Sequence, residues 1–494
     1  MTLPGHTPPL FSLPDASLPF LRTGIREYSY GQLYCFASHL SEALHTRGWQ
    51  SGSGRPLLLY TRPDAATLFM MAAAFLLKLP VLPLPQKTNE KELQHILSKV
   101  APLLYFCSGD EVTGRIEGCS CLIPDLSSWI SDSVPPDHRF SLAGADQTAG
   151  LFLTSGSTGF SKLVPLKRSQ IFFAAHASSV HVKAEPASHW LLTLPLNHVG
   201  GASIIYRSLL YHSAIWLQEG FDSDAVRILL SEQPEISVAS MVPTMLHQIM
   251  KDPVFQPHSG FRALLLGGGP ITEKLVLQAL SRKIPVVTSY GMTETAAQIA
   301  SNPLTLSETP YTGGDAGPIF PPNEAEIRDD AGLPLPHGSS GKIWLRGPQL
   351  FGGYHAYDEA QPFDLQGWFD TGDFGRITEK GHLIIQSRRT DLIITGGENA
   401  SAAVTEEALE RFEGVARAAV IGVPDETWGQ KMVAFIEPEK EMEPDQASIL
   451  AQLKGELLPH QIPKEIILTD RLPVTPALKI KKAELRERYA QTHS

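Results

Sequence analysis

The chain reads Leu153-Thr154-Ser155-Gly156-Ser157-Thr158-Gly159-Phe160-Ser161-Lys162 directly after the apolar stretch Gly150-Leu151-Phe152. The apolar stretch predicts a buried strand, and the run rich in glycine and hydroxyl groups predicts a loop at its end. Glycines let backbone N–H groups approach an anion, hydroxyl groups donate hydrogen bonds to it, and a lysine adds positive charge. Taken alone, this loop is either a cradle for a polyphosphate or an ordinary polar turn on the surface.

Two common phosphate-transfer motifs are absent from the sequence. The loop lacks the Gly-Lys-Ser/Thr ending of a P-loop, and the chain contains no His-Arg-Asp catalytic loop. These absences disfavour a P-loop ATPase and a protein kinase.

Length and composition describe a globular protein with more than one domain. The chain has 494 residues, of which 43% are hydrophobic and 19% are charged, so we expect two or three folded domains. Its 41 basic and 52 acidic residues give a formal net charge of −11, which argues against a nucleic-acid partner. Four cysteines do not make a disulfide framework in a chain of this length.

The sequence predicts neither a secretion signal nor a membrane span. Met1–His6 lacks the basic and apolar regions of a signal peptide. The most apolar helical stretch, Ala65–Leu77, is too short to cross a bilayer. We therefore expect a cytoplasmic protein, and the sequence leaves open whether it forms a homo-oligomer.

Predicted strands alternate with predicted helices through the first three quarters of the chain. The strands are Leu57–Tyr60, Leu103–Phe106, Gly150–Thr154, Trp190–Leu194, Ala214–Leu217, Ser237–Val242 and Ala263–Leu266, and the helices are Ala65–Leu77, Ala202–Tyr211 and Pro243–Met250. This alternation predicts an α/β fold of layered, mostly parallel sheets, whose ligand sites lie at the carboxyl ends of strands.

The pattern changes after about Pro318. Shorter strands at Glu324–Arg328, Gly341–Arg346 and His382–Gln386, separated by glycine and proline turns, predict a small β-rich region. After Arg388 roughly 100 residues remain, which is enough for one small α+β domain. Its predicted strands are Ile393–Ile394, Ala416–Val423 and Lys431–Ile436, and its predicted helices are Thr405–Phe412 and Gln446–Leu458.

A second polar segment, Tyr290-Gly291-Met292-Thr293-Glu294-Thr295, follows the predicted strand Pro285–Ser289. Its aromatic ring could stack on a base, Thr293 could donate to a phosphate, and Glu294 could hold a hard cation. The alternative is a tight turn into a helix with Thr293 as the N-cap.

Three further segments carry similar chemistry. In Trp368-Phe369-Asp370-Thr371-Gly372-Asp373 a carboxylate stands beside a glycine turn, where it could bind a ribose diol or simply form the turn. The pair Arg388-Arg389 precedes a glycine-rich stretch, and Lys479 lies between apolar neighbours near the end of the chain. Each segment is weak alone, but the five together indicate one site.

Together, Thr154–Lys162, Tyr290–Glu294, Thr371–Asp373, Arg388–Glu398 and the region of Lys479 resemble the motifs of the adenylate-forming enzymes. That family comprises acyl-CoA synthetases, adenylation domains and luciferases, and the resemblance covers essentially the whole chain. It implies that a carboxylate attacks the α-phosphate of Mg-ATP to give an acyl-adenylate and pyrophosphate. A thiol, usually that of coenzyme A, then attacks the activated carbonyl.

The resemblance also implies a role for each motif residue. Phosphate contacts fall to Thr154, Ser155, Gly156, Ser157, Thr158, Gly159 and Lys162, and contacts to the rest of the nucleotide fall to Gly268, Gly269, Pro270, Tyr290, Gly291, Asp373 and Arg388. Thr293 would meet the α-phosphate, Glu294 would hold magnesium, and Lys479 would bridge the carboxylate, the α-phosphate and the ribose.

The same resemblance divides the chain into parts. Residues 1–387 would form a large domain that binds ATP and the acid, and residues 392–494 a small mobile domain that carries Lys479. Residues 388–391 would form the hinge, with Thr390 at its centre, about which the small domain rotates between the two steps.

A finer resemblance concerns the acid. The segments Leu194–Gly201, Leu266–Pro270, Met292–Ile299 and Gly313–Gly317 are similar to those of family members that convert o-succinylbenzoate to its CoA thioester in menaquinone biosynthesis. That acid has an aromatic ring, a ketone and two carboxylates, so its pocket needs an apolar slot and donors for the spare carboxylate. The polar groups expected near the slot are His198, Ser203, Thr295 and Gln298. Arg207 joins them or is a solvated helix residue, and His198 contacts the acid or only gates the acyl tunnel.

The C-terminal motifs depart from the family pattern. Leu478 and Ser387 stand where relatives usually have glycine, and Ala402 and Val404 stand where they have proline and glutamate. Two alternatives stay open, of which the second is motivated by these departures. One is an enzyme for another aryl or medium-chain acid, or for a carrier-protein thiol. The other is a binding protein that holds ATP or an acyl-adenylate without turnover.

Overall fold

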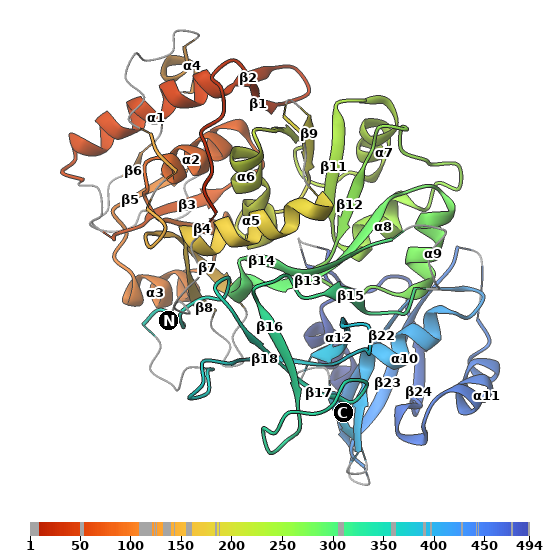
Figure 1. Ribbon diagram of the computed structural model, residues 1–494. Coiled ribbons are helices and arrows are strands. Elements are labelled where there is room, and N and C mark those ends of the chain that lie inside the picture. Colours follow the sequence, from red (N-terminus) through yellow and green to blue (C-terminus); the bar gives the residue numbers. More distant parts are fainter. Residues whose placement is uncertain are drawn as a thin grey trace.

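The computed structural model describes residues 9–49, 54–107, 121–122, 124, 126–131, 140–142, 144–154, 161–182, 185–186, 188–304, 311–356, 362–388, 392–395, 398–425, 428–440, 442, 444–475 and 478–492. Two mostly parallel sheets with helices packed on their faces form the larger part of this structure (Figure 1). The predicted α/β class is confirmed.

The first sheet has eight strands in the order β14-β13-β12-β11-β9-β10-β1-β2. Their bounds are β1 (Pro19–Arg22), β2 (Glu27–Ser29), β9 (His189–Leu192), β10 (Ala214–Leu217), β11 (Ile236–Met241), β12 (Ala263–Leu266), β13 (Val286–Met292) and β14 (Ala297–Pro303). The inner pairs are parallel, and the edge strands β2 and β14 run antiparallel to their neighbours.

The second sheet has six strands in the order β6-β5-β3-β4-β7-β8. Their bounds are β3 (Leu57–Thr61), β4 (Val81–Pro85), β5 (Leu104–Cys107), β6 (Cys121–Leu122), β7 (Thr148–Thr154) and β8 (Lys162–Lys167). In β3, Leu57 and Leu59 pack into one apolar cluster while Leu58 and Tyr60 pack into another. Because successive strand residues face opposite sides, a strand covered on both faces is apolar throughout, as β3 is.

Helices form three layers around the two sheets. The layer between the sheets contains α1 (Tyr30–His45), α2 (Ala65–Leu76), α5 (Arg168–Val182) and α6 (Val199–Tyr211). Helices α7 (Ser223–Glu232), α8 (Pro243–Ile249) and α9 (Glu273–Ser281) cover the far face of the eight-stranded sheet. Helix α3 (Glu90–Lys99) covers the far face of the six-stranded sheet, and the short α4 (Leu126–Trp129) packs on α1.

A five-stranded antiparallel sheet forms the predicted β-rich region. Its order is β15-β19-β18-β17-β16, with bounds β15 (Asp315–Pro318), β16 (Glu324–Arg328), β17 (Ser340–Arg346), β18 (Phe369–Ile377) and β19 (His382–Arg388).

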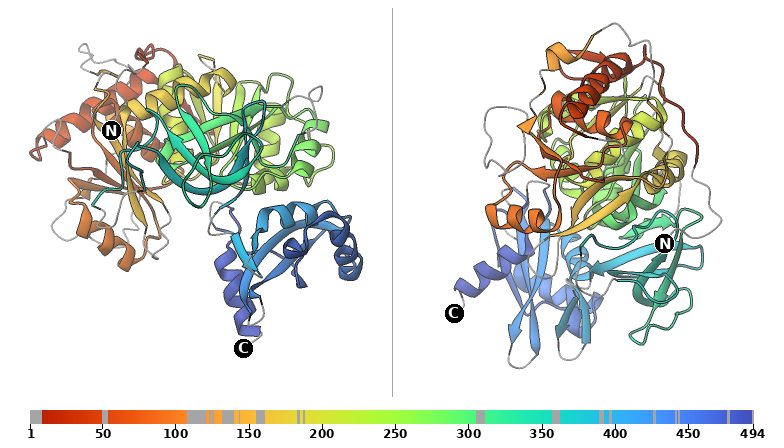
Figure 2. Two further views of the ribbon diagram at one scale, coloured as in Figure 1. Left: turned by 60° about the horizontal axis from the view of Figure 1, so that its bottom comes forward. Right: turned by 90° about the vertical axis from the view of Figure 1, so that its left-hand side faces the viewer.

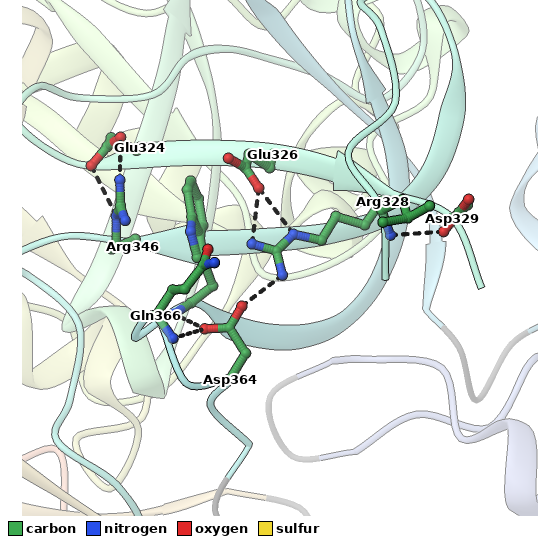
Figure 3. A network of polar contacts seen from close by, with 9 residues as sticks. Glu324, Glu326, Arg328, Asp329, Arg346, Asp364 and Gln366 are labelled. Atoms are coloured by element: carbon green, nitrogen blue, oxygen red, sulfur yellow. Dashed lines mark hydrogen bonds and ion pairs between the residues drawn. The ribbon is translucent and has the colours of Figure 1, made fainter. Parts of the chain in front are cut away.

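A polar network braces this sheet (Figure 3). Arg328 donates to Glu326 at 2.9 Å and to Asp364 at 2.7 Å, and Asp364 accepts the backbone N–H of Trp368 at 2.9 Å. The Arg346 guanidinium lies 4.4 Å from the Trp368 ring centroid. These contacts fix the loop that leads into β18.

The C-terminal residues, 392–492, form a separate sheet with its own apolar clusters on both faces; we call them the C-terminal unit (Figure 2, left). Its strands are β20 (Leu392–Thr395), β21 (Glu398–Ser401), β22 (Val415–Asp425), β23 (Gly429–Pro438) and β24 (Glu465–Leu468), and its helices are α10 (Ala402–Glu410), α11 (Gln446–Glu456), η3 (Pro459–Gln461) and α12 (Lys482–Thr492). Among the described helices, none is long and apolar enough to cross a membrane.

Several predicted boundaries were wrong. Strand β13 continues to Met292, so Tyr290–Met292, predicted as a turn, is strand, and the turn is the short helix η1 (Thr293–Thr295) with Met292 at its N-cap. Helix α6 begins at Val199 rather than Ala202 because Gly200 and Gly201 join it, and a side chain at Gly201 would overlap the Pro195 carbonyl. Helix α10 begins at Ala402 rather than Thr405.

Candidate active site

The hydroxyl of Tyr290 donates a hydrogen bond to Asp373 Oδ2 at 2.6 Å. Tyr290 lies on β13 and Asp373 on β18, and both are buried, with 8% and 4% of their surfaces exposed. Asp373 was predicted beside a turn but lies within a strand, where its backbone pairs with that of Arg388. Tyr290, Asp373 and Arg388, all predicted to bind the nucleotide, therefore lie where the eight-stranded sheet meets the five-stranded sheet.

The turn η1, which carries Glu294, directly follows the strand of Tyr290. The Thr295 hydroxyl accepts the Met292 N–H at 3.0 Å and donates to the Ala297 carbonyl at 2.7 Å. Ala297 has a φ of 81°, a conformation that side chains rarely adopt outside functional sites. A Cβ on Gly291 would overlap the Ala297 carbonyl, which explains the glycine at that position. Thr295, predicted to contact the acid, holds the turn with its hydroxyl.

Tyr354 joins Glu294 to the lysine of the hydroxyl-rich loop. Its hydroxyl donates to Glu294 Oε1 at 2.9 Å, and Lys162 Nζ lies 4.8 Å from the centroid of its ring. Two backbone hydrogen bonds hold the segment around Tyr354. Phe351 N–H donates to the Glu294 carbonyl at 2.8 Å, and His355 N–H donates to the Leu163 carbonyl at 2.9 Å. Sequence reasoning missed Tyr354, since an isolated tyrosine after two glycines carries no signal.

The hydroxyl-rich loop connects the ends of β7 and β8. Thr154 and Lys162 are directly opposite each other in this antiparallel pair. The predicted phosphate-binding residues Ser155, Gly156, Ser157, Thr158 and Gly159 lie outside the described residues. Thr154, the last residue of β7, and Lys162, the first residue of β8, are paired, and Lys162 lies beside Tyr354.

Lys479 reaches this site from the C-terminal unit. A methyl group at Gly268 would lie 3.9 Å from Lys479 Nζ, so the lysine extends to the loop Gly268–Pro270 that follows β12. The Thr244 hydroxyl donates to the Leu478 carbonyl, which anchors the lysine loop on α8. Leu478 has a φ of 58°, where glycine would be favoured, and its side chain packs against the cluster that contains Met245.

His198 lies at the N-cap of α6, close enough to Lys479 for their charges to interact. Partial desolvation lowers the pKa of His198 from its ordinary value, and the Lys479 ammonium lowers it further. His198 therefore favours the neutral imidazole near pH 7 while the lysine is in place.

A small pocket opens between α5, α6 and the residue after η1. It is lined by Ile171, Ala174, Ala175, Val199, Ser203, Tyr206, Arg207 and Ala296. Apolar groups form most of its wall, and Ser203 and Arg207 supply polarity. Two of the polar residues that the sequence predicts near the acid, Ser203 and Arg207, lie in the wall of this pocket.

Arg207 is the charged group of this pocket and is 2% exposed. It donates to Ser203 Oγ at 3.4 Å and to Gln298 Oε1 at 3.3 Å, and both its Nε and the Gln298 Nε2 are buried without a partner within the described part of the chain. Burial lowers the pKa of Arg207. This burial excludes the alternative that Arg207 is a solvated helix residue. A buried cation with incomplete hydrogen bonding favours an anionic ligand.

The described residues contain no group of three or more histidine, cysteine or carboxylate side chains that could hold a metal alone. Glu294, with 6% of its surface exposed, offers one carboxylate beside the phosphate-binding loop. Mg²⁺ is commonly held by one or two carboxylates together with substrate phosphates, so the residues present fit magnesium carried on a nucleotide.

Comparisons with known proteins agree with this arrangement. Residues 14–355 match the family model of AMP-binding enzymes, and residues 405–479 match the AMP-binding enzyme C-terminal domain. A 2-succinylbenzoate–CoA ligase from Listeria monocytogenes is 36% identical over 346 residues, covering 70% of this chain and 71% of its own length. One from Bacillus licheniformis is 30% identical over 464 residues, covering 94% and 95%.

Two solved structures are similar in fold. ATP-bound MatB from Rhodopseudomonas palustris has a TM-score of 0.85 at 27% identity and covers 98% of each chain. The o-succinylbenzoate CoA synthetase (MenE) from Bacillus subtilis, in complex with the acyl-adenylate intermediate, has a TM-score of 0.80 at 25% identity and covers 95% of each chain.

The pKa of His198 should report the position of Lys479. In Lys479→Gln the cation is removed, so we expect the pKa of His198 to rise toward its ordinary value of about 6.5. The measurement is an NMR titration of the protein with ¹³C-labelled histidine, with the His198 signal assigned from His198→Gln. Lys481→Gln, two residues further along the same loop, is the control and should leave this pKa unchanged. An unchanged pKa in Lys479→Gln would show that the lysine does not reach the site in solution.

Proposed function

This chain belongs to the family of AMP-binding enzymes, and on that premise we propose that it joins 2-succinylbenzoate (o-succinylbenzoate) to coenzyme A. ATP is the energy source, and the products are 2-succinylbenzoyl-CoA, AMP and pyrophosphate. The observation that carries the choice of acid is the buried, incompletely paired guanidinium of Arg207 in an apolar pocket beside the nucleotide site.

In the first step a carboxylate oxygen of the acid attacks the α-phosphorus of ATP, and the bond to pyrophosphate breaks. Lys479, beside Gly268, would neutralise charge that develops between the carboxylate and the α-phosphate. Asp373, held by Tyr290, would accept the ribose hydroxyls, and Lys162 would bind the leaving pyrophosphate. Magnesium held by Glu294 would neutralise phosphate charge.

In the second step the thiolate of coenzyme A attacks the acyl carbonyl, and AMP leaves with the oxygen that joined it to the acyl group. The carbonyl is reactive because AMP is a far better leaving group than hydroxide. We propose that the C-terminal unit turns about residues 388–391 between the two steps, as the resemblance implies. The enzyme would work in the cytoplasm on small-molecule substrates, with a homo-oligomer as one possible state.

Arg207 supports an acid with two carboxylates. One carboxylate would be activated at Lys479, while the other would pair with the guanidinium and complete its hydrogen bonds. A fatty acid or simple benzoate would leave this buried cation incompletely paired, which carries a large penalty in an apolar pocket. Ser203 and Gln298, which already contact Arg207, would orient its planar donor group.

An acid panel tests this proposal. The enzyme is supplied with ATP, coenzyme A and one acid at a time, and CoA thioesters and AMP are measured by mass spectrometry. We expect turnover with 2-succinylbenzoate, with far less for benzoate, medium-chain acids and 4-oxo-4-phenylbutanoate, which lacks the ring carboxylate. No turnover with 2-succinylbenzoate would contradict the proposal. A parallel series replaces coenzyme A by a carrier-protein thiol: product only in that series would favour the alternative acceptor, and no AMP in either series would favour a non-catalytic binding protein.

Arg207→Met in the same panel tests the role of the guanidinium. Loss of a charge-assisted contact should reduce kcat/KM for 2-succinylbenzoate roughly 30- to 100-fold. Activity toward 4-oxo-4-phenylbutanoate should change little, because that acid has no second carboxylate. Arg262→Met, on an exposed arginine, is the control. Equal losses for the two acids would mean that Arg207 has only a structural role.

Tyr354→Phe tests the link between Glu294 and Lys162. The ring over Lys162 is kept while the hydrogen bond to Glu294 is lost, so we expect kcat/KM for Mg-ATP to fall about tenfold and the magnesium requirement to rise. Tyr489→Phe is the matched control, because its hydroxyl donates to a carboxylate, Glu465, at 2.7 Å far from the site. An unchanged dependence on Mg-ATP would remove Tyr354 from the nucleotide site.

A further inference from the structure

Helix α9 of the larger part of the chain begins without a side-chain cap of its own. Its N-cap is Thr272, whose side chain makes no capping hydrogen bond. The first N–H groups of a helix have no partner inside the helix, and the N-terminal end carries partial positive charge. A carboxylate from elsewhere would satisfy both needs.

Such carboxylates come from α10 of the C-terminal unit. The Glu407 carboxylate lies beside Glu273, the first residue of α9; burial raises the pKa of Glu407, while Arg411 and the Glu273 backbone N–H lower it in part. One turn further along α10, Glu410 interacts with the side chain of Thr272, and burial raises the pKa of Glu410 to about 7. Since residues three apart lie on the same face of a helix, both carboxylates face the start of α9.

The surroundings of Glu407 are shaped for this contact. A Cβ on Gly313 would overlap the Glu407 carboxylate. Gly314 N–H donates to the Ile271 carbonyl at 3.1 Å, which keeps the glycine pair beside the start of α9. Glycine at position 313 therefore leaves the space that the Glu407 carboxylate occupies.

A third contact lies on the next residue of α9. Lys274 Nζ donates to the Val415 carbonyl at 3.0 Å and lies 3.4 Å from Glu439 Oε1. Val415 and Glu439 both belong to the C-terminal unit. The start of α9 thus carries contacts to two separate segments of that unit, α10 and the ends of β22 and β23 (Figure 1).

We propose that Glu407, supported by Glu410 and Lys274, forms a latch on the N-terminus of α9 that holds the C-terminal unit where Lys479 reaches Gly268. The proposal rests on the proposed function, because it makes Glu407 a positioning residue for the first of the two steps. Glu407 does not touch substrate. Its effect passes through the orientation of the unit that carries Lys479.

The contact between Glu407 and Gly313 can be tested from both sides. Glu407→Ala removes the cap, and Gly313→Ala pushes a methyl group into the carboxylate. Each change should slow acid-dependent ATP–pyrophosphate exchange about three- to tenfold. In the double variant the methyl group has room, so its loss should match that of Glu407→Ala alone rather than the product of the two. Glu413→Ala, on an exposed residue of the same unit, is the control.

Two further readouts separate positioning from general damage. Thioester formation from supplied acyl-adenylate and coenzyme A should be unchanged, because the second step does not use this orientation. The pKa of His198, measured by NMR without any acid, should rise toward its value in Lys479→Gln. Equal loss in both half-reactions, or an unchanged His198 pKa, would overturn the latch. If 2-succinylbenzoate is not a substrate, the parent enzyme shows no exchange with it, while the His198 titration still tests the latch.

Discussion

The hydrogen bond from Tyr290 to Asp373 is the contact on which the geometry of the site depends. It joins β13 of the eight-stranded sheet to β18 of the five-stranded sheet, and the Thr288 hydroxyl, which donates to the Asp315 carbonyl at 2.7 Å, links the same two sheets. Hydrogen bonds to ionised groups contribute about 1.5–3 kcal/mol, and a buried carboxylate left without one would cost more. The hydrogen bond therefore orients the Asp373 carboxylate and offsets part of the desolvation cost of burying it.

The remaining functional groups are arranged around this junction. Tyr354 links the turn η1 to the loop lysine, because its hydroxyl bonds to Glu294 and its ring lies beside Lys162, so Glu294 and Lys162 are held relative to each other. Lys479 belongs to the C-terminal unit, which has its own hydrophobic clusters. A site assembled from a rigid half and a docked half can separate two chemical steps, because the docked half can leave without disturbing the rigid one.

The sequence predicted the layers, and it placed several of the candidate site residues at strand ends that the structure brings together, for clear physical reasons. Apolar runs such as Leu57–Tyr60 alternate with helical patterns, and short Gly-rich polar segments stand at strand ends, where α/β folds place ligands. It could not predict contacts that depend on distant packing. The burial of Arg207 follows from helix α6 being covered on nearly all sides, and the hydroxyl of Tyr290 finds Asp373 only because two sheets meet.

Local sequence patterns did not indicate features that depend on backbone contacts with distant parts of the chain. The sequence predicts a helix from Ala202, yet Gly200 and Gly201 lie inside α6, and a side chain at Gly201 would overlap the Pro195 carbonyl. The Thr295 hydroxyl forms hydrogen bonds within the turn η1, a structural role that the sequence pattern did not indicate. Glu407 carries no motif, because its partner is the backbone of a helix about 130 residues earlier in the chain.

The central claim is that the acid is activated by bonding one of its own oxygens to the α-phosphorus of ATP. The most direct test supplies 2-succinylbenzoate with ¹⁸O in both carboxylates, together with ATP and coenzyme A, and measures the mass of the AMP produced. The account predicts AMP that carries one ¹⁸O atom, because the bridging oxygen leaves with AMP when the thiol attacks. Unlabelled AMP, or label in inorganic phosphate or pyrophosphate, would contradict it.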